Sequence, residues 1–400
     1  MTGGTMVLDR RSLIMGGGVA AIGLGTAPRA ARAQGMAFAP PPPIVPVMAR
    51  RDRMFRVTVC LRPFLATGPR IELERVGGKR VVHHYGHGGS GWSLSWGSAQ
   101  IAVPLALAQG KRIAVIGAGC IGLTSAITAQ RMGADVTIYT KDRFPDTRSS
   151  WATGAWTPSS RIAHVDAAGP DFPAKWERMA RASFAMHQSY LGMAGDPVEW
   201  TDRYLLSDTP AEPRAARLAA LEAAHPGRAH FAELDPMVAD MVPKSQPLDP
   251  AQHPFPTAYA RRTSTMTYNV AAYCRQLEAE FLAAGGRFVH DTFASVRDLR
   301  RIAEPVVMNC TGYAAKALFG DERLVPVRGQ IAWLLPQPGV TYGIYYRKLS
   351  VLARRDGIVV QPLGDDDYFG FGDESEAPDM AAAYAGIDDA AALFAGKPAA

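Results

Sequence analysis

Cysteine is scarce in this sequence, with four residues in 400 and no C-x-x-C pair among them. So few cysteines exclude a disulfide scaffold, and their spacing argues against a cysteine zinc site. No H-E-x-x-H spacing occurs, so no metal site is predicted. Runs of lysine and arginine interleaved with aromatic residues are also missing, which argues against a nucleic-acid partner.

Strong net charge is missing as well. The formal net charge is +6, and residues 1–33 supply +3 of it through four arginines and one aspartate. With 48% hydrophobic and 20% charged residues, the chain is typical of a folded protein of roughly two domains.

Residues 1–33 are predicted to be an export signal. Arg10 and Arg11 precede an apolar stretch of about 15 residues, shorter than the roughly 20 residues that span a membrane. Small residues around Ala33 then predict a cleavage site, as in a twin-arginine (Tat) signal. We therefore predict the Tat translocase as a partner, a periplasmic or secreted location, and no stable membrane span in the mature protein. A disordered basic tail and a membrane anchor are the alternatives.

A dinucleotide-binding pattern follows further along the chain. Residues 113–116 read as a buried strand, residues 117–122 (GAGCIG) match G-x-G-x-x-G, and residues 123–132 have helical character. A second strand is expected over 135–139, followed by Asp142. This order predicts a Rossmann-type site with the pyrophosphate at the helix N-terminus and the acid at a ribose. For Asp142 the alternative is a solvated turn residue.

Two further segments carry turn signals. Residues 86–91 (GHGGSG) repeat the glycine pattern, but the Trp/Ser-alternating stretch after them is predicted not to be a helix. Residues 304–312 read as an apolar strand ending at Thr311 and Gly312, a turn that would face a ligand in a doubly wound sheet. An ordinary strand and loop is the alternative.

Residues 81–97 (VVHHYGHGGSGWSLSWG) resemble the signature of the D-amino-acid oxidase family. Residues 61–63 with 70–75 resemble the family's substrate-arginine strand, and residues 147–158 (TRSSWATGAWTP) resemble its flavin loop. Weaker matches in character occur at 309–312, 328–330 and 343–345. The resemblance covers most of residues 54–375 and implies an FAD-dependent oxidase.

The order of the segments departs from that family. There the dinucleotide fingerprint opens the chain and the His-Gly signature lies near the C-terminus, whereas here the signature comes first. A helix expected over 99–108 then leads into the first Rossmann strand. We interpret this order as a circular permutation, which is tolerated when the original termini are close in space.

The predicted fold class is α/β, an α+β two-domain flavoprotein with a Rossmann-like FAD-binding domain and a mixed-sheet substrate domain. The predicted segments are the Tat signal 1–33, a Pro-rich spacer 34–46, substrate-domain strands 47–80, FAD-binding domain 81–165, substrate domain 166–266, FAD-binding domain 267–330, and substrate domain with a C-terminal helix 331–400.

The resemblance implies roles for individual residues. Arg62 matches the arginine that clamps the substrate carboxylate, a task suited to a planar two-donor fork. A solvated strand arginine is the alternative. Tyr345 is the second substrate-side candidate. Contacts to FAD are predicted for Gly117, Ala118, Gly119, Cys120, Ile121, Gly122, Asp142, Ser149, Gly154, Ala155, Gly88, Gly91, Trp92, Ser93, Thr311 and Gly312.

One family residue is missing. The second carboxylate-binding tyrosine is expected a few residues after the Gly-Ile-Tyr match, where this chain reads YRKLS. Tyr345 or Tyr346 is a candidate substitute, with packing as the alternative for each. Arg347 and Lys348 either favour an acidic substrate or are solvated loop charges.

The implied reaction is oxidative deamination of a D-amino acid to a 2-oxo acid, ammonia and hydrogen peroxide, with O₂ as electron acceptor. His83, His84 and His87 are interpreted as hydrogen-bonding groups, because a free amine gives hydride to flavin without a protein base. The alternatives are an oxidase or dehydrogenase of a glycine- or sarcosine-type amine, and an exported flavoprotein without turnover.

Overall fold

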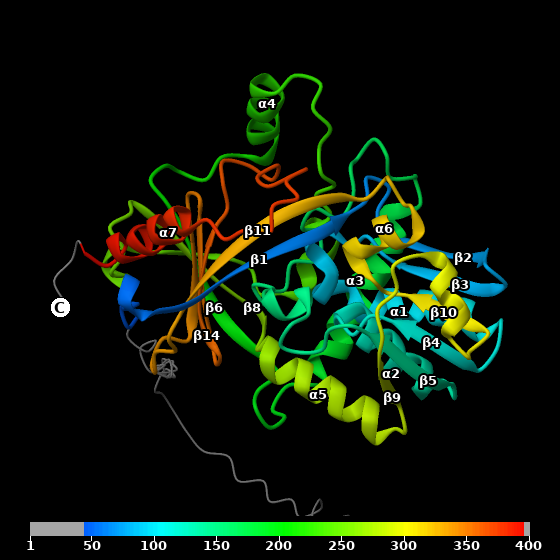
Figure 1. Cartoon of the computed structure of the whole chain (residues 1–400). Coiled ribbons are helices and arrows are strands. Elements are labelled where there is room, and N and C mark those ends of the chain that lie inside the picture. The colour runs from blue at the N-terminus through cyan, green and yellow to red at the C-terminus, as the bar shows by residue number, and fades with distance from the viewer. Residues whose placement is uncertain (1–43, 396–400) are drawn as a thin grey trace, which may run out of the picture. The chain divides into compact units, whose positions relative to one another are not determined.

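The computed structural model describes residues 44–395, which fall in one compact unit (Figure 1). The predicted Tat signal, with Arg10, Arg11 and the cut after Ala33, lies outside the described residues, as does most of the predicted spacer. Within residues 44–395, no helix is both long and apolar enough to cross a membrane. The described chain forms two sheets, one of six strands and one of eight.

The six-stranded sheet is mainly parallel. Five neighbouring strands pair in parallel, and β2 forms an antiparallel hairpin with β3 at the edge. Apolar runs such as RIAVI in β4 favour strands covered on both faces. In order across the sheet the strands are β2 (Arg70–Val76), β3 (Lys79–Tyr85), β10 (Val306–Asn309), β4 (Arg112–Ile116), β5 (Asp135–Thr140) and β9 (Arg287–His290).

Helices cover one face of this sheet. Leu123 of α2 packs in one core with Val115 and Met308, and α1 and α5 contribute to the same core. α3 packs on α1, and Leu299 covers Val307 on the opposite face. The helices here are α1 (Gly91–Leu107), α2 (Cys120–Arg131), α3 (Phe172–Gln188), α5 (Val270–Ala283) and the short α6 (Ala315–Phe319).

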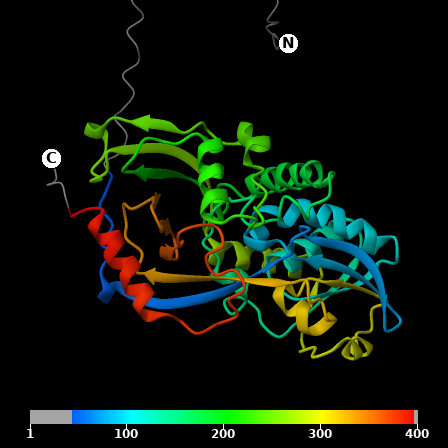
Figure 2. The same ribbon diagram turned by 90° about the horizontal axis from the view of Figure 1, so that it is seen from above.

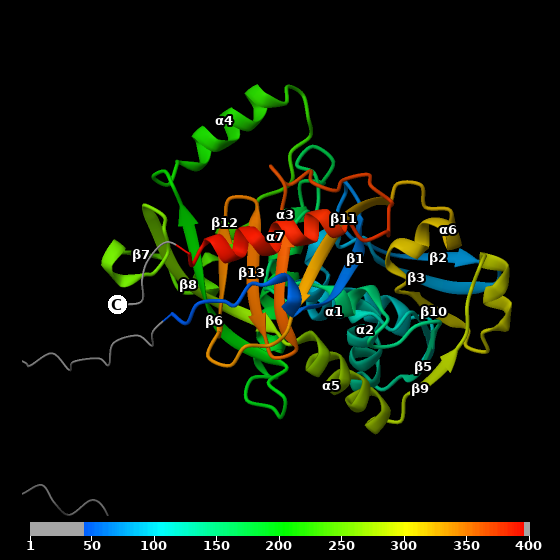
Figure 3. The same cartoon turned by 60° about the vertical axis from the view of Figure 1, so that its left-hand side comes forward.

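The eight-stranded sheet is mainly antiparallel, with one parallel pair between β12 and β6. β1 and β11 run side by side as two long strands (Figure 2). α7 lies across the outer face of the sheet, where Ile387 packs with Ile344 and Val360 (Figure 3). In order the strands are β1 (Met54–Phe64), β11 (Val325–Leu334), β14 (Gly357–Pro362), β13 (Leu349–Arg354), β12 (Tyr342–Tyr346), β6 (Val198–Ser207), β8 (Tyr259–Tyr268) and β7 (Gln246–Leu248). The remaining helices are α7 (Met380–Ala392) and the largely exposed α4 (Arg214–Ala224).

The prediction that the stretch after residues 86–91 is not helical is wrong, because α1 begins at Gly91. Residues 92–99 are all buried, so the first turns of the helix are enclosed and show no apolar stripe. The hydroxyls of Ser95 and Ser98 donate to main-chain oxygens three residues earlier, which satisfies these polar groups inside the core. Both glycine patterns therefore lie between a strand and a helix.

The predicted domain boundaries also need correction. Residues 70–80, assigned to the substrate domain, form β2 and the start of β3 in the six-stranded sheet. α3 packs mainly on α1, although its Phe184 also contacts Trp200 of β6, and β11 joins the eight-stranded sheet from Val325 onward. The pattern of a strand shows how it is buried but not which sheet it joins, because pairing partners are distant in sequence.

The two ends of the described chain lie together. Val47 and Ala49 are buried in the same cluster as Leu393, and Arg51 donates to the carboxylate of Asp388 on α7. A circular permutation requires such neighbouring ends. The permutation itself stays a prediction.

Candidate active site

The first glycine turn joins β4 to α2 and admits no side chains at two of its positions. Gly117 has φ +102°, and a Cβ there would lie 2.7 Å from the main-chain oxygen of Cys310. A Cβ on Gly122 would lie 1.9 Å from the oxygen of Gly117. Gly119 instead faces Ser149, whose hydroxyl accepts a hydrogen bond from the Cys120 N–H at 3.0 Å. The start of α2 is thereby brought close to any group bound at this edge.

The second glycine turn joins β3 to α1. Gly88 has φ +52°, and a Cβ there would lie 1.8 Å from the main-chain oxygen of Arg161. The Gly89 N–H donates to Ser160 at 2.9 Å, so residues 160–161 pack directly against this turn. The turn leaves the backbone of Gly91 and the first residues of α1 open to a cavity.

Residues 147–158 link the two turns. The Ser149 main-chain oxygen accepts from the Trp92 indole at 2.9 Å, and the Ser93 hydroxyl accepts from the Thr157 N–H at 2.8 Å. Gly154 has φ +85°, and a Cβ there would lie 2.5 Å from the oxygen of Tyr268. Ala155 forms a bridge with Thr267 of β8, which ties the loop to the eight-stranded sheet.

The carboxyl ends of the parallel strands meet at the same edge. β10 lies between β3 and β4, so its turn is next to both glycine turns. There the Thr311 hydroxyl donates to Asn309 at 2.7 Å, and Asn309 in turn contacts His83 at 3.0 Å. Asp142, after β5, pairs with Lys141 at 3.5 Å.

A cavity of about 960 Å³ extends from this edge to the inner face of the eight-stranded sheet. Every residue predicted to contact FAD lines this cavity except Gly122. Gly122 instead lets α2 pack closely against the turn. Buried ring nitrogens of His84 and His87, both cavity residues, have no hydrogen-bond partner among residues 44–395. Glycine turns, a helix N-terminus and unpaired polar atoms together fit an extended dinucleotide with a flat ring.

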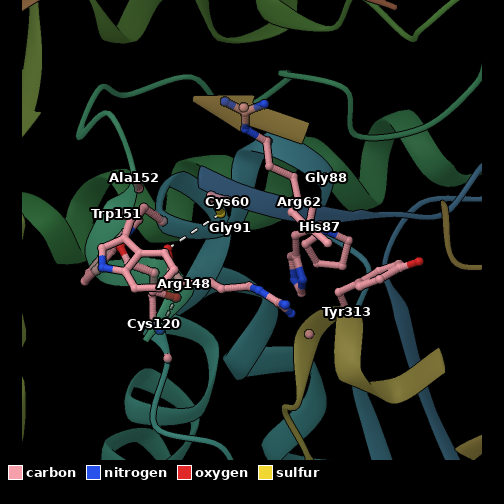
Figure 4. Close-up of a pocket in the computed structure, with 18 of the residues that line it drawn as sticks. Cys60, Arg62, His87, Gly88, Gly91, Cys120, Arg148, Trp151, Ala152 and Tyr313 are labelled. Carbon is pink, nitrogen blue, oxygen red and sulfur yellow. Dashed lines mark hydrogen bonds between the residues drawn. The ribbon is translucent and has the colours of Figure 1, made fainter. Parts of the chain in front are cut away.

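Arg62, near the end of β1, lies in the wall of this cavity (Figure 4). Its guanidinium rests against β11, where Nη1 donates to the Arg328 oxygen at 3.4 Å and a Cβ on Gly329 would lie 2.2 Å from Nη2. Burial, and then the charge of Arg161, lower the pKa of Arg62 to about 10, so it stays charged at neutral pH. It has no carboxylate partner within the described part of the chain.

The other cavity cations are already paired. Each lies beside a carboxylate, in the pairs Lys141–Asp142, Arg148–Glu376, Arg161–Asp367, Arg217–Glu233 and Arg347–Asp208. Lys348 likewise pairs with Asp365 at the surface. Arg347 and Lys348 are thus exposed loop charges rather than groups held free for a substrate.

Tyr345 of β12 lines the cavity. The hydroxyl of Tyr346 instead donates a hydrogen bond to the carboxylate of Asp208, away from the inner face of the sheet. Opposite Tyr345 in the sheet stands Ser350 of β13, which also lines the cavity. Its hydroxyl is buried without a partner among residues 44–395. A serine thus lies close to where the family's second tyrosine was expected.

Of the signature histidines, His83 and His84 form side-chain hydrogen bonds within the described residues. His83 contacts Glu74 at 2.9 Å, and His84 contacts the Ser125 hydroxyl at 2.9 Å. Burial lowers the pKa of His87 to about 3, with the charge of Lys175 adding to the effect. Burial also lowers the pKa of His84 well below its usual value. The lowered pKa values keep these imidazoles in the neutral form, and the interpretation that none of the three is a catalytic base stays a prediction.

Sequence reasoning missed several cavity residues. Arg148 extends toward His87 and Tyr313 in Figure 4, and Cys60 contacts its main-chain oxygen at 3.6 Å. Arg161 adopts a left-handed φ of +47°. Arg148 lies within residues 147–158, so the sequence marked its loop but not the residue itself. No sequence signal marks Cys60 or Arg161, because each reaches the cavity only through the packing of a distant segment.

Known proteins share parts of this chain. The model of the family described as FAD dependent oxidoreductase matches residues 112–398. The D-amino-acid oxidase of Streptomyces coelicolor is 28% identical over 228 residues, 57% of this chain and 60% of that protein. Human D-aspartate oxidase is 27% identical over 231 residues, 55% of this chain and 58% of that protein. The chain thus spans about three fifths of the length of these two relatives.

Solved structures are also similar. The iminodiacetate oxidase of Chelativorans sp. BNC1 is 17% identical with a TM-score of 0.46, covering 71% of this chain and 80% of that one. The glycine oxidase of Geobacillus kaustophilus is 15% identical with a TM-score of 0.44, covering 62% and 70%.

Proposed function

Because the chain belongs to the family of FAD-dependent oxidoreductases, we propose that it is an oxidase of D-amino acids. The products would be an imino acid, which hydrolyses to a 2-oxo acid and ammonia, and hydrogen peroxide from O₂. The observation that carries the proposal is Arg62, a half-buried, charged guanidinium in the cavity wall without a carboxylate partner among the described residues. Similarity to the D-amino-acid and D-aspartate oxidases supports it.

Bound FAD supplies the acceptor for the α-hydrogen and its two electrons. Arg62 holds the substrate carboxylate in two parallel hydrogen bonds, which orients the α-carbon within the cavity. Tyr345 borders the same space from β12. The N–H groups of Gly91, Trp92 and Ser93, at the start of α1, provide positive potential for negative charge that develops beside them. We take the substrate to enter as the free amine, which gives its α-hydride to the flavin without a protein base.

Anaerobic flavin reduction by a panel of D-amino acids, L-amino acids, glycine and sarcosine tests this proposal. We expect D-amino acids to bleach the flavin, and peroxide to appear when air is admitted. Reduction by glycine or sarcosine alone would instead support the amine alternative, which is plausible because the second tyrosine is missing from residues 346–350. Bound FAD that no amine reduces would mean a flavoprotein without turnover.

We also propose a periplasmic or secreted location, supported by Arg10 and Arg11 before the apolar stretch. Replacing both with lysine should leave FAD-loaded protein in the cytoplasm, because the translocase reads the paired arginines. Cell fractionation measures this, with the wild-type chain as control. Recovery of the double variant outside the inner membrane would refute the Tat assignment.

A further inference from the structure

Polar side chains form a row across the inner face of the eight-stranded sheet. Gln361 of β14 pairs with Ser350 of β13, which pairs with Tyr345 of β12. Arg203 of β6 pairs with Gly343, two residues before Tyr345. Cross-strand partners share a face, and so do residues two apart on a strand, so all four side chains stand on the cavity side. Gln361, Ser350 and Tyr345 line the cavity, and Arg203 ends the row behind them.

Arg203 is a buried arginine with unused donors. Its exposed fraction is 1%, and only Nη2 has a partner, the Thr267 hydroxyl at 3.0 Å. Nε and Nη1 have no partner among residues 44–395. A buried guanidinium without a counter-charge costs several kcal/mol. Arg354, which is equally buried, is instead bound by Asp356 and the Ala152 oxygen.

The sheet makes room for this guanidinium. A Cβ on Gly343 would lie 2.7 Å from Nη1 of Arg203. The Arg203 side chain therefore passes over β12 at Gly343, where the strand has no side chain. Tyr345, two residues after Gly343 on β12, stands on the same face of the sheet as Arg203. The Ser350 hydroxyl, 1% exposed as a residue, also lacks a partner within the described chain. Hydroxyl donors at the cavity wall with a positive charge behind them suit a carboxylate.

We infer that Ser350, Tyr345 and Arg203 form a second carboxylate subsite, and that the preferred substrates are D-amino acids whose side chain ends in a carboxylate. This inference rests on the proposed function. Arg62 takes the α-carboxylate at β1, and the side chain extends along the inner face to β12 and β13. There its carboxylate lies beside Ser350 and Tyr345, with Arg203 as the counter-charge behind them. The cations lining the cavity apart from Arg62 are neutralised by the carboxylates beside them.

Two variants and one control test the subsite. Arg203→Met removes the charge at similar length, and Ser350→Ala removes the hydroxyl. Arg347→Gln removes a charge at the cavity that Asp208 already neutralises. It is the control for a general change in the electrostatic potential of the cavity. FAD content and Tm report folding for each variant. The first assay compares the affinities of glutarate and butyrate, each titrated by the change in flavin absorbance. The second compares the rates of anaerobic flavin reduction by D-norvaline and by three dicarboxylic amino acids, D-aspartate, D-glutamate and D-2-aminoadipate.

In the wild type we expect glutarate to bind at least 10-fold more tightly than butyrate, and at least one dicarboxylic amino acid to exceed D-norvaline 10-fold in kcat/KM. Arg203→Met should abolish both preferences. Ser350→Ala should reduce them, and Arg347→Gln should leave them unchanged.

Equal binding of glutarate and butyrate by the wild type, or preferences that survive in both Arg203→Met and Ser350→Ala, would overturn the subsite. D-norvaline oxidation would then still uphold the proposed function. Conversely, a glutarate preference that Arg203→Met abolishes would support the subsite even if no D-amino acid reduced the flavin, and the proposed function alone would fail.

Discussion

Gly119→Val is expected to yield a folded protein that no longer retains FAD. The backbone at Gly119 is extended, with φ −73° and ψ −179°, so valine is not strained there. Its side chain would, however, meet Ser149 Oγ, which lies 2.8 Å from the Cβ position, and would occupy the approach to the N-terminus of α2. A pyrophosphate needs that approach, so we expect loss of essentially all bound FAD. The absorbance ratio of flavin to protein after gel filtration measures it.

Gly169→Val is the matched control, because a Cβ there meets nothing within 4 Å. It should keep wild-type FAD content. At the other turn, Gly91→Ala is a gentler probe than a change at Gly88, whose Cβ would strike the Arg161 backbone. Gly91 has helical φ and ψ, so alanine should alter the flavin spectrum with little effect on FAD content. Normal FAD content in Gly119→Val would show that this turn does not hold the cofactor.

Arg62→Ala should raise the KM for a D-amino acid steeply and slow flavin reduction. A hydrogen bond to a charged group contributes about 1.5–3 kcal/mol, which corresponds to a roughly 10- to 150-fold loss. Arg62→Lys should restore only part of this, because an ammonium lacks the planar fork. The defect should shrink for the decarboxylated amine, which never used the guanidinium. Anaerobic stopped-flow reduction with an amino acid and its amine measures both.

Arg56→Ala is a suitable control on the same strand. Arg56 stacks on Trp333 with its guanidinium carbon 4.8 Å from the ring centroid, and it does not line the cavity. Its removal should leave the kinetic constants near wild type. Wild-type affinity and rate in Arg62→Ala would place Arg62 among structural arginines, and the proposed D-amino-acid function would lose its main support.

The cofactor half of the site was accessible from the sequence because its parts are contiguous. Strand, glycine turn and helix around Gly117 follow one another, and Gly117 and Gly122 are required by contacts within that unit or with the neighbouring turn. The same reasoning failed after residues 86–91, where burial of residues 92–99 on every side of the first turns of α1 removes the amphipathic stripe that marks a surface helix.

The substrate half was decided by strand pairing between distant segments. The sequence by itself determined which residue types are present, including an arginine at 62, a tyrosine at 345 and a serine at 350. Only the tertiary structure decided that Ser350 stands opposite Tyr345, that Arg203 crosses the strand at Gly343, and that Arg347 is neutralised by Asp208. An isolated stretch of sequence does not show whether a charge has a partner, because the partner and the burial both come from other strands. Whether an arginine is a surface charge or a binding group is therefore a property of the folded sheet.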